Sequence, residues 1–119
     1  MPQEMTLGES LVSALAEALE KDPRVLLIGG GLVGSGPGQA QFARLRQKYA
    51  SRIKSPPIAE LGYCGIAAGA AMAGLRPLVD VGTATFSYEA IPQICNEAAI
   101  GYSNSGGKTN VVGISMNSR

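Results

Sequence analysis

The chain has 119 residues, of which 45% are hydrophobic, and its formal net charge is +1. This length allows one globular domain at most, so we expect residues 1–119 to form a single domain. The near-neutral charge and the low aromatic content give no reason to expect nucleic acid or a membrane as a partner. The chain has no histidine, which excludes Ser-His-Asp and Cys-His catalysis by these residues alone.

The start of the chain carries no recognisable targeting pattern. The first residues, MPQEMTLGES, have neither the regions of a secretory signal nor the Arg-rich composition of a transit peptide, so we expect a cytoplasmic location. The apolar run after Glu60 is shorter than a membrane span and rich in Gly and Ala, so no membrane segment is expected. Cys64 and Cys95 lie in apolar, helix-like contexts, which favours buried free thiols.

The amino-terminal half predicts a helix, a strand and a second helix. Thr6 and Glu9 have the spacing of a capping box, and leucines at four-residue intervals continue a helical stripe to about Asp22. The apolar run at 24–28 has the length of a buried strand and is followed by glycines. A second helix is expected over 39–49, with its basic residues on the solvent side.

The next part of the chain predicts a strand and a helix rich in small residues. Ile53 is expected in a brief strand before two prolines, which keep the chain extended. A helix is then expected from Glu60 onwards. Gly65, Gly69 and Ala73 are spaced four residues apart on one face of this helix, a spacing that would allow a second backbone to approach that face closely.

The carboxyl-terminal part predicts a strand over 78–81, a helix over 88–99 and a last strand over 111–114. Helices thus alternate with short apolar strands along the whole chain. This alternation predicts an α/β fold in which helices cover both faces of an open parallel sheet. The helix over 88–99 is expected to face inward with Ile91, Ile94, Cys95 and Ala98.

A glycine pattern follows the first predicted strand. Gly29, Gly31 and Gly34 fit the G-x-G-x-x-G pattern of dinucleotide-binding turns. That turn requires a helix that opens at the glycines and an acidic residue roughly 20 positions further on. Pro37 and further glycines delay the helix, and no Asp or Glu follows until Glu60. We therefore favour a loop at the carboxyl end of a strand over a nucleotide site.

The segment around Glu60 carries a long motif. Residues 56–77 read PPIAELGYCGIAAGAAMAGLRP. This segment resembles the cofactor-activating segment of the β subunit of the E1 component of 2-oxo acid dehydrogenase complexes, with the approximate pattern TPI-x-E-x-G-F-x-G-I-A-x-G-A-A-x-x-G-L-R-P. The similarity extends from about Met5 to the SGG at 105–107. It implies a truncated, transketolase-like pyrimidine-binding domain, of which this chain is the amino-terminal part.

The resemblance implies that the chain binds thiamine diphosphate and that Glu60 is the catalytic residue. In that family the glutamate hydrogen-bonds N1′ of the aminopyrimidine ring, so that the neighbouring amine can accept the C2 proton. Taken alone, Glu60 is better explained as an acid that caps a helix N-terminus, but the matching flanks favour the catalytic role. Phe86 matches the aromatic residue that packs on the ring, with a simple core residue as the alternative. Leu61 and Gly62 are expected to contact the cofactor, and Tyr63, where the family often has Phe, is a further candidate for the pocket wall.

Other positions depart from the family pattern or are ambiguous. Gly30 and Gly31 stand where the family usually carries an acidic pair near the cofactor and its proton-carrying waters. Pro92 replaces a common acidic residue. Gln93 and Asn96 lie one helical turn apart, where a hydrogen bond between them and ordinary polar helix positions are both plausible.

The resemblance also implies partner chains. In this superfamily a G-D-G…N segment holds the cofactor diphosphate and Mg²⁺, and in these enzymes it lies on the α subunit. We therefore expect an α-type partner that holds Mg²⁺, in a hetero-oligomer of the α2β2 kind. Because the family's β subunit continues well beyond position 119, a further chain is expected to supply the missing carboxyl-terminal part.

Together these features predict a β-type subunit of a thiamine diphosphate-dependent 2-oxo acid dehydrogenase or decarboxylase. It would be active only with its partners, in decarboxylation followed by acyl transfer. The alternative is a non-catalytic assembly or regulatory subunit that retains the fold, which Gly30 and Gly31 favour. A nucleotide-binding fragment ranks last.

Overall fold

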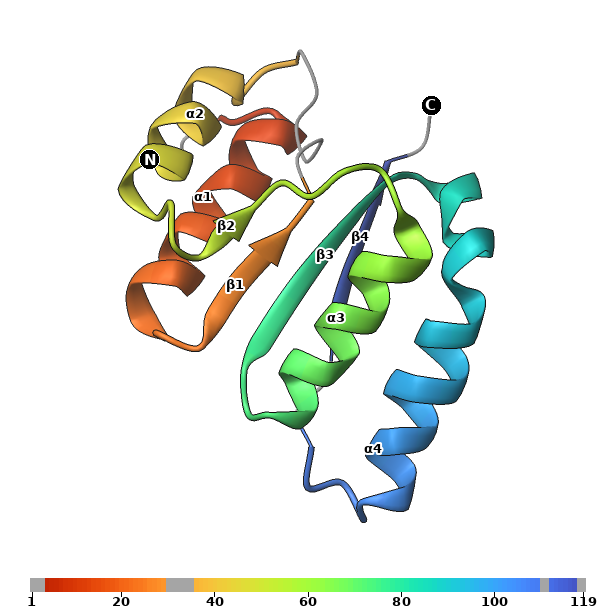
Figure 1. The fold of residues 1–119 in the computed structure, drawn as a ribbon. Helices are drawn as coiled ribbons and strands as arrows, with labels where there is room; N and C mark the ends of the chain where they lie inside the picture. The colour runs from red at the N-terminus through yellow and green to blue at the C-terminus, as the bar shows by residue number, and fades with distance from the viewer. Residues whose placement is uncertain (1–3, 30–35, 110–111, 118–119) are drawn as a thin grey trace.

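The computed structural model describes residues 4–29, 36–109 and 112–117. In this part of the chain, four parallel strands form one sheet in the order β2-β1-β3-β4 (Figure 1). Each connection between consecutive strands contains helix, as parallel pairing requires. The predicted α/β class with an open parallel sheet is confirmed. The strands are β1 Val25–Ile28, β2 Ile53–Lys54, β3 Arg76–Thr83 and β4 Gly113–Asn117.

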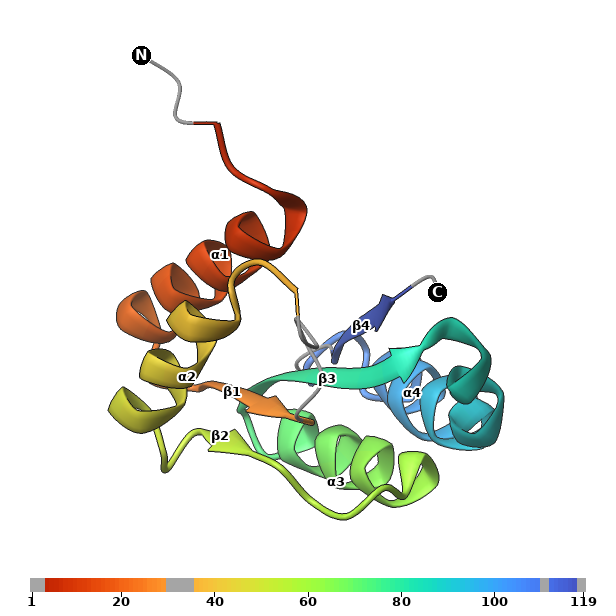
Figure 2. The same cartoon turned by 90° about the horizontal axis from the view of Figure 1, so that it is seen from above.

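Helices cover both faces of the sheet (Figure 2). Helices α1 and α2 lie together on one face, while α3 and the helical segment 84–104 lie on the other. The segment 84–104 changes geometry twice, from a 3₁₀ helix (η1) through a π-helical stretch (η2) to an α-helix (α4). The bounds are α1 Leu7–Lys21, α2 Gln39–Lys48, α3 Glu60–Met72, η1 Ala84–Ala90, η2 Pro92–Ala99 and α4 Ile100–Asn104.

Both ends of α1 are tied by polar contacts. The predicted capping box is confirmed, because the Glu9 N–H donates to Thr6 Oγ1 at 3.3 Å and the Thr6 N–H donates to the Glu9 carboxylate at 2.9 Å. At the other end, the Arg52 guanidinium donates to the carbonyl oxygens of Leu19 at 2.6 Å and Asp22 at 3.0 Å. These bonds satisfy helix-end carbonyls and link α1 to the start of β2.

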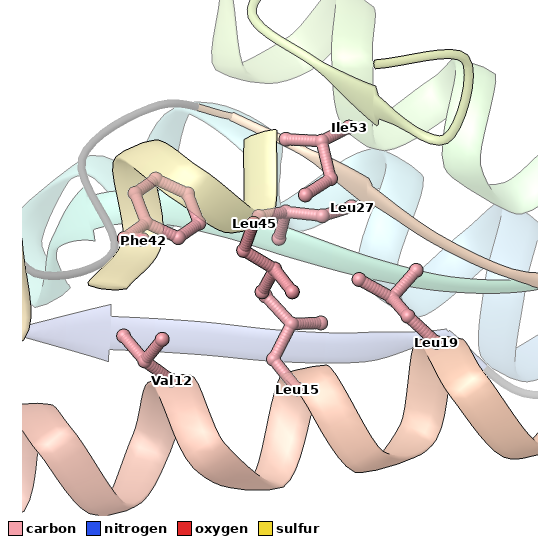
Figure 3. Packing of buried hydrophobic residues seen from close by; sticks show 7 residues of the cluster. All are labelled: Val12, Leu15, Leu19, Leu27, Phe42, Leu45 and Ile53. Carbon is pink, nitrogen blue, oxygen red and sulfur yellow. The ribbon is translucent and has the colours of Figure 1, made fainter. Parts of the chain in front are cut away.

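Large aliphatic side chains fill the space between α1, α2 and the sheet (Figure 3). We call this cluster the first core. None of its members is more than 7% exposed, and Leu19 and Leu27 are at most 1% exposed. Burial of each such side chain contributes about 1.5–3 kcal/mol to the stability of the folded state, relative to an exposed side chain. The first core consists of Val12, Leu15, Leu19, Leu27, Phe42, Leu45 and Ile53.

The opposite face of the sheet packs against α3 through smaller side chains, which we call the second core. Ala67 and Ala68 of α3 are at most 2% exposed, and their small size allows the helix to lie close to the strands. Tyr63 is the one aromatic member of this cluster among the described residues. The second core consists of Ile28, Tyr63, Cys64, Ala67, Val79, Val81 and Ala90.

The predicted inward face of the helix over 88–99 is partly wrong. Ile94 packs against the second core, but Ile91 is 44% exposed and Cys95 is exposed. The prediction assumed 3.6 residues per turn, whereas the π-helical stretch from Pro92 to Ala99 has wider turns that rotate side chains away from that phase. The expectation of a buried thiol is therefore right for Cys64 and wrong for Cys95.

The small-residue face of α3 is only partly covered. A Cβ built at Gly65 would lie 3.0 Å from Gln93 Oε1, and nothing lies within 4 Å of one at Gly69. Among the described residues, the group that comes nearest to Gly65 is therefore the Gln93 side chain. Among the described residues, no helix has the length and apolar composition needed to cross a membrane.

Candidate functional site

A pocket of about 300 Å³ lies at the carboxyl ends of β1 and β3. Ligands of open α/β sheets bind at this edge, in the crevice beyond the strand ends. The wall combines apolar groups with two carboxylates and a phenol. The lining residues are Gly29, Ser55, Pro56, Ile58, Glu60, Tyr63, Asp80, Val81, Gly82 and Phe86.

Glu60 reaches this pocket from the first turn of α3. It is partly buried and is the first residue of the helix, where the positive end of the helix dipole favours a negative charge. The prolines before it keep the chain extended, and Pro56 itself lines the pocket. The predicted start of the helix at Glu60 is confirmed.

Phe86 reaches the same pocket from η1, the helix that follows β3. The pairing of β3 with β4 is irregular between Asp80 and Thr83, and Gly82 in this stretch has a φ of +73°, at which a side chain would be strained. A Cβ built there would lie 3.8 Å from Phe86 Cδ2, so the ring folds back over the end of β3. Phe86 is 47% exposed, which leaves part of the ring available to a ligand.

Leu61 and Gly62 are not among the residues that line this pocket. Leu61 is 48% exposed and Gly62 is also exposed. Each helical residue turns its side chain by about 100°, so the positions directly after Glu60 point away from the pocket. Their contact with a cofactor stays a prediction.

Tyr63 lies one helical turn after Glu60 and is 7% exposed. Burial raises the pKa of the Tyr63 phenol well above its usual range. The nearby Glu60 carboxylate raises this pKa further, with smaller contributions from Cys64 and Asp80. Like any tyrosine at physiological pH, this phenol is protonated and can donate a hydrogen bond.

Asp80 is a site residue that the sequence reasoning missed. It is 3% exposed at the end of β3, and its Oδ1 accepts from the Gly82 N–H at 3.0 Å. Its Oδ2 is buried without a hydrogen-bond partner among the described residues. The available signal was an acidic residue inside the predicted strand 78–81, since buried carboxylates are rare unless paired.

Gly29 allows Asp80 to occupy this position. Its φ is +124°, and a Cβ built there would lie 2.5 Å from the Asp80 carbonyl oxygen and 2.9 Å from the Asp80 Cβ. Only glycine fits at such a distance. The other positions of the nucleotide-type pattern, Gly31 and Gly34, lie outside the described residues, as does Gly30.

A second cavity, of about 320 Å³, lies between η2, α4 and β4. Its wall is mostly apolar and includes Cys64, Ile94, Tyr102 and Ile114, with no carboxylate among its lining residues. In the described part of the chain, no group of three or more His, Cys, Asp or Glu residues is placed to hold a metal ion. The pocket at Glu60 therefore has the stronger chemical signature.

The pocket at Glu60 suits a flat heteroaromatic ring that carries nitrogen donors. Phe86 offers an aromatic face, Ile58 and Val81 offer apolar contacts, and Glu60 offers a hydrogen-bond acceptor. An aminopyrimidine has this combination of features. The residues present thus fit the cofactor that the resemblance implies.

The chain is similar to known proteins over most of its length. The chain is 43% identical over 110 residues to the pyruvate dehydrogenase E1 component subunit beta, mitochondrial, of Bos taurus, and 42% identical over 106 residues to that of Homo sapiens. These alignments cover 91% and 87% of this chain but only 30% and 29% of the relatives. The chain therefore spans under a third of their length.

A solved structure supports the same relationship. It is described as a split gene transketolase, inactive beta4 tetramer, and it matches with a TM-score of 0.68 at 26% sequence identity. The match covers 91% of this chain and 32% of that chain.

The expected cytoplasmic location is wrong, because the bovine and human relatives, and that of Drosophila melanogaster, are mitochondrial proteins. The expectation rested only on the composition of the first residues, which has no physical link to the fold or to the site.

The resemblance read from residues 56–77 is confirmed. The family model for the transketolase pyrimidine binding domain matches residues 3–118. This chain belongs to the transketolase pyrimidine-binding domain family.

Proposed function

We propose that this chain is the pyrimidine-side part of a β-type subunit of a thiamine diphosphate-dependent 2-oxo acid dehydrogenase. One observation carries the proposal: Glu60 and Phe86, which come from different elements, line the same pocket at the carboxyl ends of β1 and β3. The 43% identity to a pyruvate dehydrogenase E1 β subunit supports the same reaction class.

Glu60 is proposed to bind and orient the cofactor ring. Its carboxylate would accept a hydrogen bond at N1′ of the aminopyrimidine and hold a proton at that atom. When bound, thiamine diphosphate supplies a carbon nucleophile for the ketone of the 2-oxo acid and an electron sink for decarboxylation. Phe86 would pack on the ring, and Ile58 and Val81 would exclude water from it.

The diphosphate and Mg²⁺ are proposed to bind to an α-type partner subunit, in a hetero-oligomer of the α2β2 kind. A further chain would supply the carboxyl-terminal part that the relatives carry. Exposed apolar side chains on and before α3 support an interface there: Ile58 is 89% exposed and Ile66 is 63% exposed.

The test is to co-express the chain with its candidate partner chains and titrate the complex with thiamine diphosphate in the presence of Mg²⁺ by calorimetry. We expect the wild-type complex to bind the cofactor and to decarboxylate at least one of a panel of 2-oxo acids. Glu60→Gln should lower the decarboxylation rate by roughly 100-fold or more, because a positioned acid–base group typically contributes about 10²–10⁴-fold.

Glu17→Gln is the matched control, since Glu17 makes an exposed ion pair with Lys21 on the outer side of α1. This variant should keep the wild-type rate. Full activity of Glu60→Gln would contradict the catalytic role. A complex that assembles without binding the cofactor would instead support the alternative, a non-catalytic assembly subunit.

A further inference from the structure

Tyr63 is placed to act on Glu60. It stands three residues after Glu60 in α3, so the two side chains lie on the same helix face. Both line the pocket at the carboxyl ends of β1 and β3. Tyr63 is only 7% exposed, and a pocket carboxylate is the strongest type of acceptor available to its O–H.

Two carboxylates adjoin this phenol in the pocket wall. Glu60 lies on the same helix, and Asp80 lies on β3. The Cys64 thiol on α3 is the other titratable group that influences Tyr63. The remaining pocket residues lie directly after β1, in the β2–α3 connection, in β3 and in η1, and none of them carries a charge. Burial first and the Glu60 carboxylate next raise the pKa of the phenol, so the hydroxyl is protonated and available as a donor.

We propose that Tyr63 is a positioning residue for Glu60: its hydroxyl donates to one carboxylate oxygen and leaves the other oxygen to accept from the aminopyrimidine. This inference rests on the proposed function. A glutamate side chain has several rotatable bonds, and a charge-assisted hydrogen bond restricts them before the ligand arrives. Binding then costs less conformational entropy, and the acceptor oxygen is held in a productive orientation.

Tyr63→Phe removes one oxygen atom and keeps the ring that packs in the second core. In the complex with its partner chains, we expect this variant to bind thiamine diphosphate roughly tenfold more weakly at neutral pH, as for the loss of one hydrogen bond to a charged group.

Tyr49→Phe is the matched control, because Tyr49 packs against the first core on the other side of the sheet. It should leave the affinity for thiamine diphosphate unchanged.

A double-mutant cycle decides whether Tyr63 acts through Glu60. In the Glu60→Gln background, Tyr63→Phe should change the dissociation constant less than about twofold. An undiminished effect in that background overturns the inference and leaves the proposed function standing. The same holds if a parallel cycle with Asp80→Asn shows that Tyr63 is coupled to Asp80 instead. Absence of cofactor binding by the wild-type complex overturns both proposals.

Discussion

The two faces of the sheet are built on different principles. The first core, between the sheet and α1 and α2, consists of large aliphatic side chains and one phenylalanine. The second core, against α3, has alanines, a cysteine and a tyrosine, and it borders a pocket with two carboxylates. The first face is arranged for burial of apolar surface. The second accepts polar groups and an opening, both of which cost stability.

This difference indicates where stability and chemistry reside. Large buried side chains on the α1 side contribute most of the apolar burial that holds β1 and β2 in place. On the α3 side, the carboxylate of Asp80 is buried, and one of its oxygens has no hydrogen-bond partner among the described residues. Burial of an unpaired polar atom lowers the stability of the fold. Such violations of folding rules are expected at functional sites.

The largest stability effect should come from the first core. Leu19→Ala removes a side chain that is 1% exposed and should lower the free energy of unfolding by about 3 kcal/mol, from lost burial plus the cavity left behind. Urea unfolding followed by circular dichroism measures this. Leu7→Ala, on the same helix but 87% exposed, should change the free energy of unfolding by less than about 0.5 kcal/mol. Similar losses for both variants would contradict the assignment of the core to this face.

The contact between Gly29 and Asp80 should have an intermediate effect. Gly29→Ala combines a strained φ with a Cβ only 2.5 Å from the Asp80 carbonyl oxygen, and we expect a loss of about 2–3 kcal/mol in unfolding free energy. Gly106→Ala is the control, because Gly106 also has a positive φ of +68° but nothing lies within 4 Å of its added Cβ. It should cost about 1 kcal/mol, so the difference isolates the close approach. Equal losses would mean that backbone strain alone explains Gly29.

The smallest effect should be a gain in stability on α3. Gly69→Ala introduces a Cβ into open space within a helix and should raise the free energy of unfolding of the chain by about 0.5–1 kcal/mol. Gly65→Ala should gain less, because its Cβ would lie 3.0 Å from Gln93 Oε1 and that side chain must move. Thermal or urea unfolding distinguishes the two. A loss on Gly69→Ala would show that the outer face of α3 is already packed in solution.

Most element types followed from local patterns. The capping box at Thr6, the apolar strand at 24–28 and the start of α3 at Glu60 depend on residues close in sequence, and all three are confirmed. Strand lengths were less accurate: β3 extends over Arg76–Thr83 rather than 78–81. The last strand is Gly113–Asn117 rather than 111–114, and residue 111 lies outside the described part of the chain. Strand ends depend on pairing with neighbours, which a single segment does not encode.

The sequence by itself determined the parallel α/β class, through its alternation of helices and apolar strands, and it singled out Glu60 and Phe86 through a long motif. Only the tertiary structure brought Asp80 and Tyr63 together with them. That grouping depends on the register of β1 against β3, on the close approach at Gly29 and on the packing of α3 over both strands. Local propensity acts over one or two turns of chain, whereas a pocket is defined by contacts between segments far apart in sequence.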